Sequence, residues 1–281
     1  MKLIHLTDTH LVLPGQMLYG LDPAARLAAA IADINAQHAD ADLCVVTGDL
    51  THWGEPEAYA LFRERMADLR VPHVAMVGNH DRREACLAAL PTAPQDANGF
   101  VQGFRDSPAG RLIFLDTLDE DHHGGRLCRL RLDWLAGALE SSGRDQPLLL
   151  FMHHPPFEVG VHEMDRIALA EREALLDLLR PYLGRVRHLF FGHVHRPISG
   201  SWHGIPFSTL RGTNHQVWLD LRPDCPHLAS HEPPAYAVVL ARGATLVVHT
   251  HDFLDRSPRF LFSKPGADNR AYQLGPLEPV A

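Results

Sequence analysis

The chain has 281 residues, with 46 % hydrophobic and 21 % charged residues, which is an ordinary composition for a globular protein with a sizeable core. Its formal net charge of −8 argues against a nucleic-acid-binding protein, because such proteins normally carry a basic surface. No apolar run is long enough to cross a bilayer, and no secretory signal precedes the first predicted strand, so we expect no membrane partner.

Strand-like runs alternate with amphipathic helical runs along the chain. In the first half, we predict strands at 2–8, 41–49 and 71–78, and helices at 23–38, 55–69 and 82–90. In the second half, we predict strands at 111–117, 147–154 and 186–195, and helices at 130–141 and 167–183. Short β runs follow at 197–202, 205–210, 235–241 and 244–253. This alternation predicts a layered α/β fold.

No linker divides the chain, and no repeat of solenoid length is present. We predict one catalytic domain over 1–262, with loop elaborations near 11–22, 119–128 and 212–234, followed by an irregular arm at 263–281 that is rich in proline and glycine. The cysteines are scattered and form no CxxC pair, which favours free thiols in a reducing compartment and a cytoplasmic location.

Polar residues follow one predicted strand after another, and the chain holds 20 histidines. The motifs are TDTH with Asp8 and His10, TGD with Asp49, GNHD with Asn79 and His80, MHH with His153 and His154, and GHVH with His193 and His195. Ligands of α/β sheets bind at the carboxyl ends of strands. Together these groups exceed the needs of one tetrahedral ion, so a two-metal site with Mn, Fe, Zn or Co explains them better.

In order and spacing, these motifs resemble the calcineurin-like metallophosphoesterase superfamily over roughly residues 1–250. The segments GNHDRRE, MHHPPF and RGTNHQV resemble those of one branch of the superfamily, the bacterial class III cyclic nucleotide phosphodiesterases and glycerophosphodiesterases. The resemblance implies an αββα sandwich, in which two central mixed β-sheets are flanked by helices. It also implies a homo-oligomer.

The resemblance further implies a role for each polar residue. Asp8, His10 and His195 would bind one divalent transition-metal ion, Asn79, His153 and His193 a second, and Asp49 would bridge the two. His80 would face the scissile phosphate as a hydrogen-bond donor or general acid, beside Asn79, and His215 matches a histidine of the substrate pocket.

Two such ions about 3.5–4 Å apart can hold a bridging hydroxide at neutral pH. We expect this hydroxide to attack phosphorus in line with the leaving alkoxide, while His80 stabilises the leaving oxygen.

The segment GDLTHWG favours a diester as the substrate. The superfamily's protein Ser/Thr phosphatases place an arginine soon after the GD motif, where it can clamp a doubly charged monoester. Because this chain has none there, we expect a small phosphodiester, either a cyclic nucleotide such as 3′,5′-cAMP or a glycerophosphodiester. The alternatives are a nuclease or broad-specificity phosphoesterase of the same superfamily, and a non-catalytic scaffold protein.

Residues close to these motifs are also given expected roles. We expect Asp81 to cap the helix at 82–90, with a supporting role behind the metal site as the alternative. Trp53 is expected to be a packing anchor rather than an aromatic wall for a base, and Arg82 and Arg83 to point outward. The DEDHHGG loop at 119–125 is expected to be solvated and near the pocket mouth.

Charge counting leads to a prediction for Asn79. Two divalent ions, two aspartates and one hydroxide leave the site with a net charge of about +1, which attracts an anionic diester. We expect Asn79→Asp to retain metal but lose turnover, because the added carboxylate cancels this charge. Metal analysis and kcat check it; a variant that matches the parent in both would contradict the argument.

Overall fold

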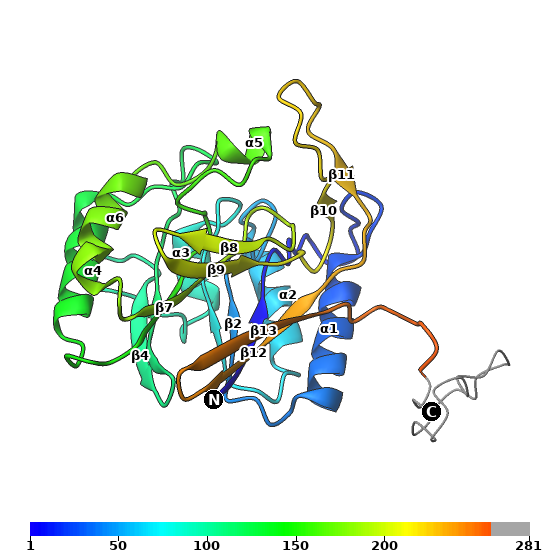
Figure 1. Ribbon diagram of the computed structural model, residues 1–281. Helices are drawn as coiled ribbons and strands as arrows, with labels where there is room; N and C mark the ends of the chain where they lie inside the picture. Colours follow the sequence, from blue (N-terminus) through cyan, green and yellow to red (C-terminus); the bar gives the residue numbers. More distant parts are fainter. Residues whose placement is uncertain (260–281) are drawn as a thin grey trace, which may run out of the picture.

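The structure is a computed structural model that describes residues 1–259, so the arm predicted at 263–281 and the end of the predicted domain lie outside the described residues. Two β-sheets lie face to face at the centre, with helices on both outer sides (Figure 1). The first sheet has the order β13-β12-β1-β2-β3. Its strands are β1 (Lys2–Leu6), β2 (Leu43–Val46), β3 (His73–Ala75), β12 (Tyr236–Arg242) and β13 (Thr245–His251). Strands β1, β2 and β3 are parallel, whereas β12 is antiparallel to β1.

The second sheet has the order β4-β5-β6-β7-β9-β8. Its strands are β4 (Gly103–Ser107), β5 (Gly110–Phe114), β6 (Leu148–Phe151), β7 (Val186–Phe191), β8 (Ser199–Trp202) and β9 (Ile205–Thr209). The four inner strands are parallel, and the edge strands β4 and β8 are antiparallel to their neighbours. Strands β10 (Gln216–Val217) and β11 (Ala229–Ser230) form a separate hairpin, which projects away from the sheets (Figure 1).

Apolar stripes on the helices attach them to the outer faces of the sheets. The helices are α1 (Pro23–Gln37), α2 (Pro56–Met66) and α3 (Arg83–Ala89) on the first sheet, and α4 (Arg129–Glu140) and α6 (Arg172–Leu179), followed by the short helix η1 (Arg180–Tyr182), on the second. Helix α1 is an example of this amphipathic pattern: Asp22 caps its first turn, and Leu27, Ile31 and Ile34 line the buried stripe. No helix within residues 1–259 is long and apolar enough to cross a membrane.

A third apolar cluster fills the space between the sheets and completes the four layers. Leu3 and Val45 of the first sheet contribute to it, together with Phe114, Phe151 and Phe190 of the second. The rings of Phe151 and Phe190 are stacked, with centroids 4.6 Å apart. The αββα sandwich expected from the sequence is therefore confirmed.

The main differences from the sequence prediction concern segment ends. The helix predicted at 167–183 begins only at Arg172, because Leu169 and Ala170 instead donate backbone hydrogen bonds to Pro155 and Gly125 of neighbouring loops. The polar ends of the predicted strands are loops rather than strands. Strand β4 and the short helix α5 (His162–Asp165) were not predicted, since neither shows a clear apolar period.

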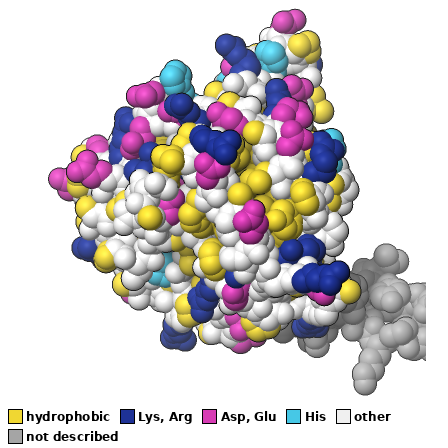
Figure 2. Space-filling model, turned by 90° about the vertical axis from the view of Figure 1, so that its left-hand side faces the viewer, with side chains coloured by type: hydrophobic (Ala, Val, Ile, Leu, Met, Phe, Trp, Pro, Cys, Tyr) yellow, Lys and Arg dark blue, Asp and Glu magenta, His cyan; other side chains and the backbone are white. Residues whose placement is uncertain are grey.

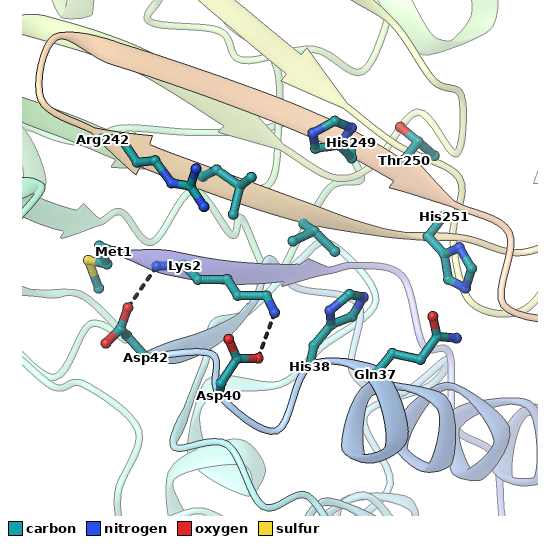
Figure 3. A pocket seen from close by; sticks show the side chains of 12 residues that line it. Met1, Lys2, Gln37, His38, Asp40, Asp42, Arg242, His249, Thr250 and His251 are labelled. Carbon is teal, nitrogen blue, oxygen red and sulfur yellow. Dashed lines mark hydrogen bonds and ion pairs between the residues drawn. The ribbon is translucent and has the colours of Figure 1, made fainter. Parts of the chain in front are cut away.

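Basic and acidic side chains are interspersed on the face shown in Figure 2, rather than gathered into one basic stripe. A cavity of about 630 Å³ lies between the start of β1, the end of α1 and β13 (Figure 3). Lys2, one of its cations, is paired with Asp40 at 2.6 Å. This cavity lies at the amino end of β1, whereas the polar motifs follow the carboxyl ends of strands.

Two of the many histidines are core residues between the sheets. His5 of β1 contacts Phe151 and Phe190 edge-on, and its Nε2 lies 2.8 Å from the Thr47 hydroxyl. His188 of β7 lies 2.8 Å from the Ser208 hydroxyl. Burial lowers the pKa of His5 to about 3 and that of His188 to about 4, so both rings are neutral in the folded protein near pH 7.

We predict that His188 makes the fold sensitive to acid. Below the ordinary pKa of 6.5, the unfolded chain takes up a proton that folded His188 refuses until about pH 4, so stability is lost as the pH falls through this window. The loss is about 1.4 kcal/mol per pH unit. His188→Gln, compared with the parent by urea unfolding in chelator, should show a shallower pH dependence. The exposed control His249→Gln should leave the slope unchanged; equal slopes for all three proteins would refute the assignment.

Candidate metal centre and active site

The loops at the carboxyl ends of both sheets bring the predicted ligands together. Asp8 and His10 follow β1, Asp49 follows β2, and Asn79 follows β3 of the first sheet. His153 follows β6, and His193 and His195 follow β7 of the second sheet. The loops that carry the predicted ligands therefore lie at the carboxyl ends of the strands, which point toward the top of Figure 1.

Most of these ligand positions have a left-handed backbone. The φ angles of Asp8, His10, Asp49, His193 and His195 lie between 47° and 69°. In the described chain, only two other non-glycine residues share this conformation, Tyr19 and His203. Such backbone costs about 1–3 kcal/mol per residue and concentrates at functional sites. The unusual backbone of the turns that follow the strands therefore marks these positions as a candidate functional site.

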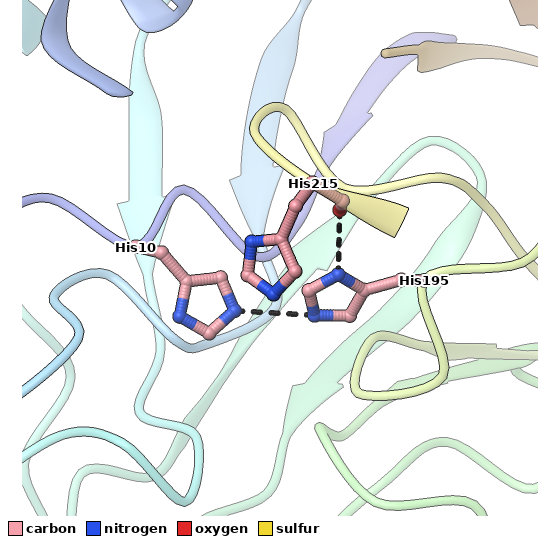
Figure 4. A group of neighbouring side chains, drawn as sticks. All are labelled: His10, His195 and His215. Carbon is pink, nitrogen blue, oxygen red and sulfur yellow. Dashed lines mark hydrogen bonds between the residues drawn. The ribbon is translucent and has the colours of Figure 1, made fainter. Parts of the chain in front are cut away.

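A first group of ligand atoms gathers around Asp8. Its Oδ1 lies 3.2 Å from His195 Nε2, which lies 3.1 Å from His10 Nε2. Figure 4 shows how the His10 and His195 rings approach one another beside His215. His10 Nε2 also lies 3.5 Å from Asp49 Oδ2. Asp8 Oδ2 is buried without a hydrogen-bond partner, as expected of an atom that a cation would satisfy.

A second group gathers around the amide oxygen of Asn79. Its Oδ1 lies 3.1 Å from His153 Nε2 and 2.8 Å from His193 Nδ1. His153 Nε2 lies 3.4 Å from Asp49 Oδ2. The same Asp49 oxygen therefore adjoins both groups, which is the position that a bridging ligand would need. Oxygen and imidazole nitrogen donors without sulfur fit two borderline or hard divalent cations.

Backbone carbonyls fix the orientation of two of the rings predicted to be ligands. His153 Nδ1 donates to the carbonyl of Thr47 at 2.7 Å, and His195 Nδ1 donates to the carbonyl of His215 at 2.8 Å. Each bond holds the ring proton on Nδ1 and leaves Nε2 free to act as a ligand.

The electrostatics follow from two carboxylates buried among these rings. Burial raises the pKa of Asp49, but His153 and His80 outweigh it and hold this pKa well below its usual range. Burial lowers the pKa of His153, but the neighbouring Asp49 carboxylate raises it to about 9. Burial holds the pKa of His10 and His193 well below the usual value. In the absence of a cation, a proton on His153 thus compensates the buried charge.

Glycines let the ligand-bearing loops approach one another. A Cβ atom at Gly78 would lie 2.2 Å from Asp49 Oδ1, and one at Gly192 would lie 2.1 Å from Thr7 Oγ1. Because no other residue fits in these gaps, the glycines of the GNHD and GHVH motifs permit close packing of the two sheets' loops.

A family model described as calcineurin-like phosphoesterase matches residues 1–197 of this chain. The chain belongs to the calcineurin-like phosphoesterase family. It is 47 % identical to a probable cyclic nucleotide phosphodiesterase of Rhodopseudomonas palustris, over 92 % of this chain and 95 % of that protein. It is 35 % identical to a glycerophosphodiester phosphodiesterase of Enterobacter lignolyticus, over 77 % of this chain and 79 % of that one.

A third relative and a solved structure extend the comparison. The chain is 33 % identical to a 3′,5′-cyclic adenosine monophosphate phosphodiesterase of Pseudomonas aeruginosa, over 69 % of each protein. The structure of a purple acid phosphatase from yellow lupin is similar with a TM-score of 0.65, over 91 % of this chain and 52 % of that one. At 17 % identity, the lupin structure supports the fold alone.

In this calcineurin-like phosphoesterase, His80 stands beside the two ligand groups. Its backbone N–H donates to Asp49 Oδ1 at 2.9 Å, and its Nδ1 donates to the carbonyl of His52 at 2.9 Å. His80 lines a cavity of about 440 Å³, together with Asn79, Tyr19 and His215. The ring centroids of His215 and His195 lie 4.7 Å apart. Burial lowers the pKa of His215 to about 2, so His215 faces this cavity as a neutral ring.

The expectation that Asp81 caps a helix is wrong. Helix α3 begins at Arg83 without a side-chain cap. The buried Asp81 carboxylate instead accepts hydrogen bonds from the backbone N–H groups of Leu50, Thr51 and Gly78, and from the hydroxyls of Thr51 and Tyr59. Asp81 thereby ties the GD loop to the GNHD loop behind the candidate metal site, in line with the alternative role expected from the sequence.

Two further expectations are wrong. Arg83 does not point outward, because its guanidinium donates to the buried Asp116 carboxylate at 2.7 and 3.0 Å. Arg82 is exposed, as expected. Trp53 is not a buried packing anchor: its side chain is 54 % exposed and lines a second cavity of about 390 Å³ beside His80.

The 119–125 loop lies at the mouth of the site, and one of its residues is a contact that the sequence analysis missed. His123 Nδ1 accepts a hydrogen bond from Asn79 Nδ2 at 3.0 Å. Both ring nitrogens of the buried His154 have hydrogen-bond partners: Nε2 lies 3.1 Å from the His123 carbonyl, and Nδ1 lies 2.8 Å from the Thr117 hydroxyl. The adjacent histidines of this loop could be seen in the sequence as possible site residues, but only the folded loop shows that the ring of His123 is the one that reaches Asn79.

Proposed function

We propose that the chain hydrolyses small phosphodiesters, and that cyclic nucleotides such as 3′,5′-cAMP are its favoured substrates. At the level of reaction class, the chain is a phosphodiesterase. The observation that carries the proposal is the position of Asp49 Oδ2, which adjoins His10 at 3.5 Å and His153 at 3.4 Å, beside a cavity lined by His80.

The chain's residues would hold two cations in this arrangement. We assign Asp8, His10, Asp49 and His195 to one ion, and Asn79, His153, His193 and Asp49 to the other. When bound, such ions supply activation of water and electrostatic stabilisation of the phosphate. Two carboxylates do not neutralise two divalent cations, so this ligand set retains a net positive charge that attracts an anionic diester.

His80 is suited to act on the leaving oxygen. Its Nδ1 proton is committed to the His52 carbonyl, so its Nε2 carries a proton only when the ring is an imidazolium. An imidazolium at the cavity wall can donate from Nε2 to the departing alkoxide, while the backbone N–H of His80 keeps Asp49 oriented.

The cavity supports a diester that carries a flat, uncharged group beside its phosphate. Met164, Ile167 and Val217 form an apolar part of its wall, and Tyr19 adds an aromatic ring. No lysine or arginine lines it in the described chain, so it offers no extra side-chain cation to a doubly charged monoester. A nucleobase can cover this apolar wall, whereas a glycerol group would leave most of it in water.

Glycerophosphodiesters are the second candidate, because a relative at 35 % identity is named a glycerophosphodiester phosphodiesterase. A nuclease is less well supported, since the cavity lacks the basic, aromatic-lined channel that a polynucleotide needs. A non-catalytic scaffold would be expected to lose ligand-type side chains, whereas those of this chain converge around Asp49.

The proposal is tested by a hydrolysis panel on the Mn²⁺-loaded protein with 3′,5′-cAMP, 2′,3′-cAMP, a glycerophosphodiester and a phosphomonoester. We expect kcat/KM for a cyclic nucleotide to exceed that for the glycerophosphodiester by about 10-fold or more, because only the base contacts the apolar wall. A reversed order would select the second candidate. A strong preference for the monoester would contradict the diester assignment.

A second prediction concerns His80. If its Nε2 protonates the leaving oxygen, His80→Ala should lower kcat for 3′,5′-cAMP by about 10²–10⁴-fold. The same variant should affect bis(p-nitrophenyl) phosphate far less, because p-nitrophenolate leaves without a proton. Steady-state kinetics on both substrates at saturating Mn²⁺ measure the ratio. Equal losses on the two substrates would exclude a general-acid role.

A further inference from the structure

We propose that His52 is a positioning residue of this centre: its Nδ1 accepts a hydrogen bond from the ligand ring of His10, and its imidazole supports the ring of His80. His52 lies three residues after Asp49, and its side chain is 7 % exposed. The inference rests on the proposed role of His10 as a metal ligand.

The contact between His10 and His52 dictates the tautomers of both rings. The two Nδ1 atoms lie 3.0 Å apart, which fits an N–H···N hydrogen bond in which one ring donates and the other accepts. His10 Nε2 faces Asp49 and His195, so it must keep its lone pair for a cation. The His10 proton is therefore on Nδ1, and His52 accepts at its own Nδ1 and carries its proton on Nε2.

This arrangement differs from that of the other ligand rings with a fixed Nδ1 proton. His153 and His195 donate to backbone carbonyls, which no substitution of the accepting residue removes. His10 donates to a side chain. Position 52 is therefore a place where one substitution can change the orientation of a ligand without touching the ligand itself.

His52 also connects this ligand to the residue that faces the substrate. Its ring stacks on His80, with centroids 4.5 Å apart and planes inclined by 17°. Its carbonyl accepts the Nδ1 proton of His80 at 2.9 Å. The ring of Trp53 contacts His52 edge-on at 4.6 Å, which limits the freedom of the His52 ring. One residue thus supports the orientation of both His10 and His80.

Two substitutions separate the two contacts. In His52→Asn, the side-chain oxygen takes the place of Nδ1 two bonds from Cβ, so the acceptor is kept and the stacking ring is lost. In His52→Phe, the ring is kept and the acceptor is lost. The exposed His249→Phe, on β13, is the matched control for adding a phenyl ring.

The first readout is Mn²⁺ binding by isothermal titration calorimetry. We expect His52→Phe to weaken one of the two Mn²⁺ sites by about 10–100-fold, because the His10 ring loses its partner. His52→Asn and His249→Phe should bind Mn²⁺ like the parent. The second readout is kcat for 3′,5′-cAMP at saturating Mn²⁺, where His52→Asn should lose about 2- to 10-fold through the missing stack.

These measurements distinguish a failure of the proposed role of His52 from a failure of the metal centre itself. Parental Mn²⁺ affinity in His52→Phe, or equal weakening in His52→Asn, would overturn the role of His52 alone. A parent that binds no Mn²⁺ would overturn the metal centre and this inference together. If His52→Phe fails to fold, long-range ¹H–¹⁵N NMR of the Zn²⁺-loaded parent still decides: we expect a proton on His10 Nδ1 and His52 Nε2, and the reverse assignment would overturn the proposal.

Discussion

Two carboxylates, Asp8 and Asp49, are buried where the loops of the two sheets meet, and the surrounding structure follows from the cost of keeping them there. A carboxylate removed from water needs positive charge and hydrogen-bond donors around it. The backbone N–H groups of His80 and His193 donate to Asp49 and Asp8, and the Nε2 atoms of His153 and His195 face the same two carboxylates at 3.4 and 3.2 Å. Divalent cations would supply the positive charge that neutral imidazoles lack, which explains why so many ring nitrogens face inward.

Asn79 shows how one side chain can satisfy two demands. Its oxygen faces the rings of His153 and His193, while its nitrogen donates to His123. An aspartate could serve the first contact but has no proton for the second. The neutral amide is therefore favoured by the local hydrogen bonds as well as by the net charge of the centre.

The fold and the members of the candidate site could be predicted from the sequence, because both depend on short-range patterns. Alternating strands and helices indicate the layers, and polar residues after successive strands must meet at one edge. The contacts of His52, Asp81 and His123 could not be predicted in this way. Each joins loops that follow different strands, and the partner depends on loop conformation that no periodicity encodes. Helix α3 illustrates the limit: its start was predicted closely, but the aspartate before it bonds elsewhere.

The left-handed turns at the ligand positions also constrain how this protein can change over evolutionary time. Asparagine, aspartate, histidine and glycine tolerate such backbone, whereas β-branched residues do not. A descendant that abandoned metal binding could not simply fill positions 8, 10, 49, 193 and 195 with valine or isoleucine. It would be expected to carry glycine or asparagine there. Residues that tolerate left-handed backbone would therefore remain at these positions even after metal binding was lost.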